Sequence, residues 1–290
     1  MSKLKTDLSM KKYFFTLLLI SVTIALYAQD LKVMTYNIRL DLKSDGLNAW
    51  DNRKDFFTAQ IGFYEPDIFG VQEARPNQVL DIAKALPQYS YVGVGRDGNN
   101  TGEASNIFYK KSRFQLKDSG TFWLSETPGV VSKGWDAAYN RVCTYVLLKD
   151  KKSKKQFWFF NTHLDNVGVT ARRKGVELIL SKMKELDTSN LPVIFTGDLN
   201  SEPNDSLIQY LKTQLTDTRE VSMHQPFGPS GSFNGFKHDQ VVTMLIDYIF
   251  VSHSSPLVVN KYAILSDSKN LRYPSDHLPV YVELEYRKKK

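Results

Sequence analysis

The hydrophobic runs of this chain repeatedly stop at a side chain that can bind a divalent metal ion or carry a proton. Four such runs have the length and composition of β-strands. They occupy residues 32–36, 67–72, 157–162 and 192–197, and they are followed by Asn37, Glu73, His163 and Asp198, with Asn200 two residues further on.

Two more sites of this kind lie near the C-terminus. Asp247 interrupts the apolar run 244–251, and Asp276 and His277 immediately precede the apolar run 278–282. Turns and helix caps do not account for six such positions at strand ends. The set predicts one cleft that holds carboxylates, amides and two histidines.

Helices separate several of these strands. Apolar residues spaced three and four apart predict helices over residues 52–64, 77–86 and 170–186. Between them, short strands are predicted over residues 89–95, 105–109, 120–124, 142–148 and 156–161. This alternation predicts an α/β domain with layered sheet buried on both faces, although spacing alone does not predict the strand order. No repeat, low-complexity tract or linker divides residues 29–290, so we expect a single domain.

Residues 1–28 are expected to lie outside that domain. Lys11 and Lys12 precede an apolar stretch, residues 13–28, that is short for a membrane span and typical of a secretory signal peptide. Cleavage after Ala28 would leave a periplasmic or secreted protein without stable membrane association, and we expect a monomer. An uncleaved membrane anchor is the alternative.

Cysteine content and charge narrow the class of protein. Cys143 is the single cysteine, so no intramolecular disulfide is possible, and its apolar surroundings predict a buried residue without chemistry. The net charge of +7 is confined to the ends, because residues 1–28 carry +3 and residues 287–290 carry +4. Residues 29–286 are therefore neutral, which argues against a tight grip on long duplex DNA. The lysine cluster at residues 149–155 is predicted to be a solvated hairpin turn.

Several candidate residues also have a purely structural interpretation. Asp247 needs a cation or a histidine as partner if it is buried, and otherwise faces solvent on an edge strand. Asp198 and Asn200 present oxygens into one space, but the same sequence is common in loops. Glu73 is either a metal ligand or the cap of the helix that follows it.

Two of the five histidines stand beside an acid, since Asp165 follows His163 by two residues and Asp276 precedes His277. Imidazole takes or gives a proton near neutral pH, and a carboxylate can hold its tautomer, whereas a structural histidine is the alternative. The candidate ligands are oxygen donors without a cysteine cluster, which predicts Mg²⁺ or Mn²⁺ rather than structural zinc. Such an ion among carboxylates and histidines suits hydrolytic attack on phosphorus.

The strand-end residues form six motifs in a fixed order. They are Thr35-Tyr36-Asn37-Ile38, Gln72-Glu73, Asn161-Thr162-His163-Leu164, Gly197-Asp198-Leu199-Asn200, Ile246-Asp247-Tyr248-Ile249 and Ser275-Asp276-His277-Leu278-Pro279. This set resembles the endonuclease/exonuclease/phosphatase superfamily, whose fold is that of deoxyribonuclease I. The resemblance extends from Asn37 to His277 and implies a four-layer α-β-β-α sandwich of two packed mixed sheets, with the site at the rim between them.

The resemblance also implies which residues bind the metal and the substrate. Glu73 would be the principal metal ligand, with Asn37 and Asp276 beside it, and Mg²⁺ or Mn²⁺ would be the ion. Arg141 would supply a cation near the phosphate, and the alternative is an ordinary surface salt bridge.

The same resemblance implies the catalytic roles. Asp198 would orient or deprotonate the attacking water, and Asn200 would hold the phosphate. Asp247 would orient His277, and His163 would contact the phosphate or assist the leaving group.

Within the superfamily, residues 122–128 and the triplet 163–165 resemble an exported bacterial branch related to exonucleases of the carbon-catabolite-repressor and nocturnin type. We expect a metal-dependent phosphodiesterase or phosphatase, with nuclease or exonuclease action on nucleic acids or nucleotides as the leading interpretation. Hydrolysis of sugar, inositol or lipid phosphates is one alternative, and a non-catalytic binding protein on this fold is another. Trp123 and Trp135 either stack a base or sugar or pack in the core.

Overall fold

The computed structural model describes residues 30–253 and 255–287, so the expected signal peptide lies outside the described residues. The described strands are β1 (Leu31–Asn37), β2 (Ile68–Gln72), β3 (Tyr89–Val92), β4 (Ile107–Lys110), β5 (Phe114–Trp123), β6 (Val142–Asp150), β7 (Gln156–His163), β8 (Val193–Asp198), β9 (Leu215–Asp217), β10 (Asp247–Ser252), β11 (Leu257–Ile264) and β12 (Val280–Tyr286). The helices are η1 (Lys43–Asn48), α2 (Trp50–Tyr64), α3 (Pro76–Ala85), α4 (Val169–Leu186) and α5 (Ser206–Lys212).

These strands form two six-stranded mixed sheets, in the orders β11-β12-β1-β2-β4-β3 and β5-β6-β7-β8-β10-β9. Each sheet has one parallel pair near its centre, β1 with β2 and β7 with β8, and the other neighbours are antiparallel. A parallel connection needs a long crossover, which α2 and α4 supply. Because the two strands of each pair end at the same edge, Asn37, His163 and Asp198 come to lie at strand ends in the middle of the sheets.

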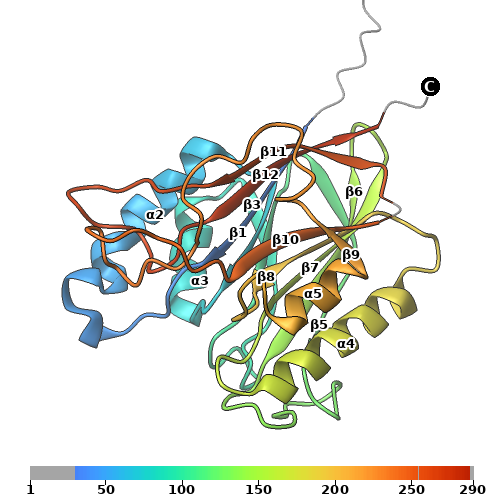
Figure 1. Ribbon diagram of the computed structural model, residues 1–290, viewed down its shortest axis with the longest axis horizontal. Helices are drawn as coiled ribbons and strands as arrows, with labels where there is room; N and C mark the ends of the chain where they lie inside the picture. The colour runs from blue at the N-terminus through green and yellow to red at the C-terminus, as the bar shows by residue number, and fades with distance from the viewer. Residues whose placement is uncertain (1–29, 254, 288–290) are drawn as a thin grey trace, which may run out of the picture. The chain divides into compact units, whose positions relative to one another are not determined.

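The helices cover the outer faces of the two sheets (Figure 1). Trp50 and Phe57 of α2 and Ile82 of α3 share a core cluster with Tyr36 and Phe69 of the first sheet. Helices α4 and α5 bury their apolar faces in the larger cluster that also fills the space between the sheets. The resulting order of helix, sheet, sheet and helix confirms the predicted four-layer sandwich.

A buried amide network joins the two sheets. Asn161 on β7 donates to the carbonyls of Val71 (2.9 Å) and Asn106 (3.0 Å), and its Oδ1 accepts a hydrogen bond from Gln72 at 2.7 Å. Gly70 permits this approach, because a Cβ at that position would collide with the Asn161 side chain. Buried polar groups stabilise a core only when they are paired, so this network fixes the sheets relative to each other close to the strand ends.

Most of the expected elements agree with the structure. The three predicted helices lie within two residues of α2, α3 and α4, and Cys143 is buried. The lysine cluster forms the turn between β6 and β7, where Asp150 accepts backbone hydrogen bonds from Lys152 and Ser153. Strand β11 was not predicted. Among the described residues, no helix is both long and apolar enough to span a membrane.

Candidate active site

A buried aspartate–histidine pair lies at one edge of the second sheet. Asp247 begins β10 and is paired in register with Asp198 at the end of antiparallel β8. His277 lies just before β12, and its Nδ1 is 2.8 Å from Asp247 Oδ2. The same oxygen accepts a hydrogen bond from Ser232 Oγ at 2.6 Å. The expectation that a buried Asp247 needs a histidine or cation is confirmed, and the exposed-edge alternative is wrong because Asp247 is 0% exposed.

Asp198 connects the two histidines. Its Oδ2 lies 3.4 Å from His163 Nε2 and 3.8 Å from His277 Nε2. Asn200 approaches His163 Nε2 with its side-chain nitrogen at 3.0 Å, and its backbone N–H donates to Asp198 Oδ1. Asn200 has a left-handed φ of 46°, which asparagine tolerates better than most residues, and this conformation turns the chain back toward His163.

Three oxygen-bearing residues form a second group at the end of the first sheet. Asn37 Nδ2 donates to Glu73 Oε1 at 3.1 Å and to Asp198 Oδ2 at 2.9 Å, so it bridges this group to the histidines. Glu73 has a left-handed φ of 62°, an uncommon conformation for a residue other than glycine, and its Oε2 accepts from Leu40 N. Asp276 is held beside Asn37, because Ser275 Oγ donates to the Asn37 carbonyl at 2.7 Å.

Arg141 approaches the site from the side of β6. It is 5% exposed, and it binds Asp165 through Nε at 3.2 Å and Asn166 through Nη2 at 3.1 Å. A small hollow next to it is also lined by Glu73 and His163. The surface-salt-bridge alternative is therefore wrong, and Arg141 Nη1 is buried without a hydrogen-bond partner among the described residues.

Burial and charge set the protonation of this centre. Burial, and then the charge of Asp247, raises the pKa of Asp198 to about 7. Burial opposes the charged form of His277, but Asp247 and Asp198 outweigh it and raise the pKa of His277 to about 10. Burial, aided by the positive charge of Arg141, lowers the pKa of His163 well below its ordinary value. At neutral pH His277 is thus charged and His163 is neutral. The pKa of the Asp198 carboxyl group lies close to neutral pH.

The two acids that stand beside the histidines in sequence are not their partners in the structure, whereas the implied contact of Asp247 with His277 is present. Asp165 accepts hydrogen bonds from Arg141 and from the backbone of Ala138, Val167 and Gly168 instead of from His163. His277 takes Asp247 rather than Asp276 as its partner. The reason is that the chain turns directly after β7, which points the Asp165 carboxylate back at its own loop.

Several supporting residues were not predicted. Ser232 binds Asp247, and the Phe233 ring packs edge-on against His277 with centroids 5.1 Å apart, so this segment contributes directly to the site. Arg53 on α2 is 4% exposed, and its donors reach four backbone carbonyls. Neither Ser232 nor Arg53 lies inside an apolar run, so the sequence carries no comparable signal for them. Trp123, for which stacking or core packing was expected, is half-buried and donates from Nε1 to the Arg96 carbonyl.

Every residue predicted for the site thus lies in one connected region, where Asp198, Asp247 and His277 bring ligating atoms within 4.8 Å of one another. A four-layer sandwich with such residues at the ends of its central strands is typical of the deoxyribonuclease I-like class, whose members include phosphoester hydrolases. The chain belongs to the Endonuclease/Exonuclease/phosphatase family, whose model matches residues 34–277.

Known relatives agree with this membership. The solved structure of a mannosyl-6-phosphatase from Bacteroides thetaiotaomicron is similar, with 40% identity, a TM-score of 0.84, and coverage of 88% of this chain and 100% of that one. An uncharacterized protein of Acanthamoeba polyphaga mimivirus is 26% identical over 81% of this chain and 92% of its own length. Nocturnin of Rattus norvegicus is 22% identical over 88% of this chain and 66% of its own length.

Proposed function

We propose that this protein is a divalent-metal-dependent phosphatase that removes phosphate from a phosphorylated sugar. The observation that carries the proposal is the 40% identity to the mannosyl-6-phosphatase over the whole of that chain. The neutral charge of residues 29–286 supports a compact substrate over a long polyanion. Nuclease action, the leading interpretation of the sequence, is the second candidate, and the similarity to nocturnin favours it.

In this proposal Glu73, Asn37 and Asp276 hold the metal ion. Their side-chain oxygens are the kind of ligand that Mg²⁺ and Mn²⁺ prefer. Burial raises the pKa of Asp276, and the nearby charge of Glu73 adds to the effect, so a cation between the two carboxylates would relieve both costs. When bound, such an ion neutralises the phosphate and its leaving oxygen.

Asp198, Asp247 and His277 also have the composition of a metal site, but their mutual hydrogen bonds support a different role. Asp247 Oδ2 accepts from His277 and Ser232, whereas Asp247 Oδ1 has no partner among the described residues. Both oxygens of Glu73 also accept hydrogen bonds, so the ion's position needs a direct measurement. Calorimetric titration with Mn²⁺ separates the two assignments. Glu73→Gln should weaken binding of the ion more than tenfold and Asp247→Asn less than threefold, and the reverse order would move the ion to the aspartate–histidine group.

The protein's own groups then divide the proton and charge chemistry. Asp198, with a pKa near neutral, orients the attacking water and accepts its proton. His277, kept charged by Asp247, stabilises the negative phosphoryl oxygens, and Arg141 adds its unpaired Nη1 donor. Neutral His163 and Asn200 contact the phosphate and the leaving oxygen.

A substrate screen tests the function. Purified residues 29–290 would be incubated with hexose phosphates, nucleotides, oligonucleotides, inositol phosphates and phospholipid vesicles, with Mg²⁺ or Mn²⁺ and with a chelator. We expect chelator-sensitive phosphate release that is fastest from a hexose phosphate and is lost in His277→Ala. His253→Ala is the matched control, because His253 is exposed. Faster cleavage of oligonucleotides would favour the nuclease, and no hydrolysis of any compound would favour a binding protein.

We also propose that the domain acts outside the cytoplasm, after removal of residues 1–28. The support is the charged pair followed by the apolar stretch at residues 13–28. N-terminal sequencing of the protein from a periplasmic or culture fraction should begin near Gln29. Recovery of the intact N-terminus from the membrane fraction would instead favour an uncleaved anchor.

A further inference from the structure

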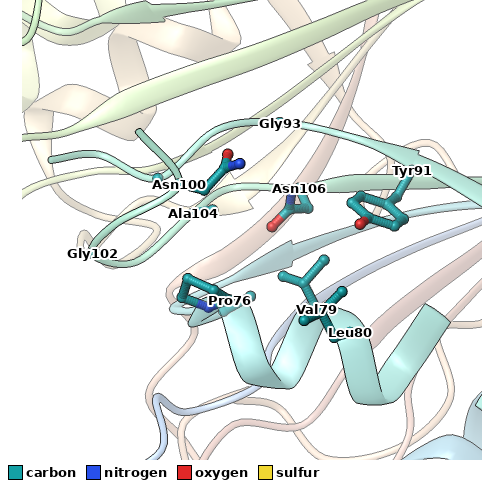
Figure 2. A pocket seen from close by; sticks show the side chains of 11 residues that line it. Pro76, Val79, Leu80, Tyr91, Gly93, Asn100, Gly102, Ala104 and Asn106 are labelled. Carbon is teal, nitrogen blue, oxygen red and sulfur yellow. The ribbon is translucent and has the colours of Figure 1, made fainter. Parts of the chain in front are cut away.

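A second hollow lies beside Ala74, the residue that follows Glu73 after the end of β2. Its volume is about 220 Å³, and it lies between the start of α3 and the segment 91–106 (Figure 2). Ala74, the residue after Glu73, lines it together with Ala104, and Ala104 N donates to the Ala74 carbonyl at 2.8 Å. Ala104 also lines the hollow beside Arg141 and His163, so the two hollows adjoin at this residue.

The walls of this hollow are apolar, with a few amides. Val79 and Leu80 rise from α3 on one side, opposite Tyr91 and Asn106 on the other (Figure 2). None of the residues that line it in the described chain carries a charge. Tyr91 is 39% exposed and Leu80 61% exposed, so both side chains are accessible to a ligand in the hollow.

One wall offers an unused hydrogen-bond acceptor. Asn106 is 2% exposed, its Nδ2 donates to the Val92 carbonyl, and its Oδ1 has no partner among the described residues. The oxygen is directed toward the hollow in Figure 2. A buried acceptor without a partner is costly, so a ligand that brings a hydroxyl or N–H donor would be favoured there.

Glycines give the far wall its shape. The segment 95–104 folds back on itself through the bonds from Arg96 N to the Glu103 carbonyl and from Thr101 N to the Gly98 carbonyl. Gly102 has a φ of 75°, and a Cβ there would strike the Asp97 carboxylate. The hollow is therefore formed by a tightly constrained backbone before any ligand arrives, which lowers the entropy cost of binding.

We propose that this hollow binds a neutral, hydroxyl-bearing ring, namely a second sugar unit of a phosphorylated glycan whose terminal phosphate occupies the metal centre. The absence of lining charge excludes a second phosphate, and Tyr91 and Leu80 offer a face for the apolar side of a sugar ring. The volume is below the roughly 300–1,000 Å³ of pockets for drug-sized ligands and suits one ring. The inference rests on the proposed sugar-phosphatase function and extends it to the size of the substrate.

The test compares two substrates that differ by one sugar unit. Wild type and Tyr91→Ala would be assayed on a hexose phosphate and on the disaccharide that carries the same phosphorylated hexose. We expect the ratio of kcat/KM for disaccharide over monosaccharide to fall about tenfold in Tyr91→Ala. Leu80→Glu places a charge at an exposed position of the hollow and should also lower the ratio. This variant leaves the packing of Tyr91 against Phe108 intact, so it does not depend on that contact.

Exposed residues away from the hollow supply matched controls. Phe63→Ala and Leu271→Glu remove an aromatic ring and add a charge at positions that are 79% and 76% exposed, and they should leave the ratio unchanged. An equal ratio in wild type, Tyr91→Ala and Leu80→Glu would overturn the inference while leaving the phosphatase intact.

If the wild type hydrolyses neither sugar phosphate, the proposed function fails, and the hollow is then tested by binding alone. Methyl resonances of Val79, Leu80 and Ala104 would be followed during titration with the unphosphorylated disaccharide. Saturable shifts in wild type that are weakened in Tyr91→Ala would support the sugar site. Unmoved resonances would overturn it.

Discussion

Replacing Arg53 by methionine tests whether a buried cation on α2 supports the metal centre. Its guanidinium donates to the carbonyls of Asn48 (2.8 Å), Ile38, Pro274 (3.1 Å) and Arg39 (2.6 Å). Two of these carbonyls directly follow Asn37, and Pro274 lies two residues before Asp276. One side chain thereby joins the segments that carry two of the three proposed metal ligands.

The expected loss of stability in Arg53→Met follows from the burial of Arg53 and from the number of hydrogen bonds that it makes. Burial lowers the pKa of Arg53 to about 10, so the group stays charged at neutral pH and each bond is charge-assisted. Removing a buried charged partner typically costs about 3–5 kcal/mol, because the carbonyls left behind are unpaired. For a domain of this size, that corresponds to a fall in Tm of about 6–20 °C. Arg53→Met should still fold, since domains have roughly 5–15 kcal/mol of stability.

Two measurements check the prediction. Differential scanning calorimetry gives the fall in Tm, and titration with Mn²⁺ at a temperature where the variant is folded gives the affinity for the ion, which should fall at least tenfold. Lys54→Met is the matched control. The Lys54 ammonium makes ion pairs with Asp51 (2.7 Å) and Asp81 (3.6 Å) at the surface, and such pairs contribute little, so neither quantity should change appreciably. A Tm for Arg53→Met within about 2 °C of wild type, with unchanged ion affinity, would refute the reasoning.

Three other changes probe the site. Asp247→Asn removes the charge that holds His277, so kcat should fall about 10²–10⁴-fold in steady-state assays, and an unchanged kcat would contradict the pairing. The lowered pKa of Asp165, about 2 against an ordinary 3.8, stabilises the fold by about 2 kcal/mol above pH 4, and this contribution is lost as the pH falls from 3.8 to about 2. Urea unfolding of wild type and Asp165→Asn should therefore show a stability gap that narrows by about 1 kcal/mol between pH 7 and pH 3, whereas a constant gap would argue against an ionic role. Mg²⁺ at a hundredfold excess over its Kd should stabilise the wild type by about 2.7 kcal/mol and Glu73→Gln much less, and equal shifts in melting would remove Glu73 from the ion site.

The sequence was informative where a polar residue interrupts or ends an apolar run. A strand that enters the core and stops at Asp198 or His163 leaves that side chain at a sheet edge, whatever the order of the strands. Asp247 was the sharpest case, because a carboxylate inside a buried run needs a partner. These local rules suffice to predict the α/β class and the members of the site.

Contacts between distant segments could not be predicted in the same way. Nothing near Arg53 in sequence shows that its partners include the residues just after β1 and Pro274 in the loop before β12. Asp165 lies only two residues from His163 in sequence, yet the turn after β7 directs its carboxylate to Arg141. Strand β11 alternates weakly and has a register shift between Val259 and Lys261, so its pattern did not stand out.

The position of β12 has a consequence for when the protein becomes active. This strand inserts between β11 and β1, although it is the last described strand in sequence. Until it docks, one side of β1 has no hydrogen-bonding neighbour, and His277, which leads into β12, is not beside Asp247. A ribosome-bound chain that stops short of residue 280 would therefore hold most of the fold while His277 is not yet held by Asp247, so the proposed hydrolysis would begin only after nearly all of the domain has been synthesised.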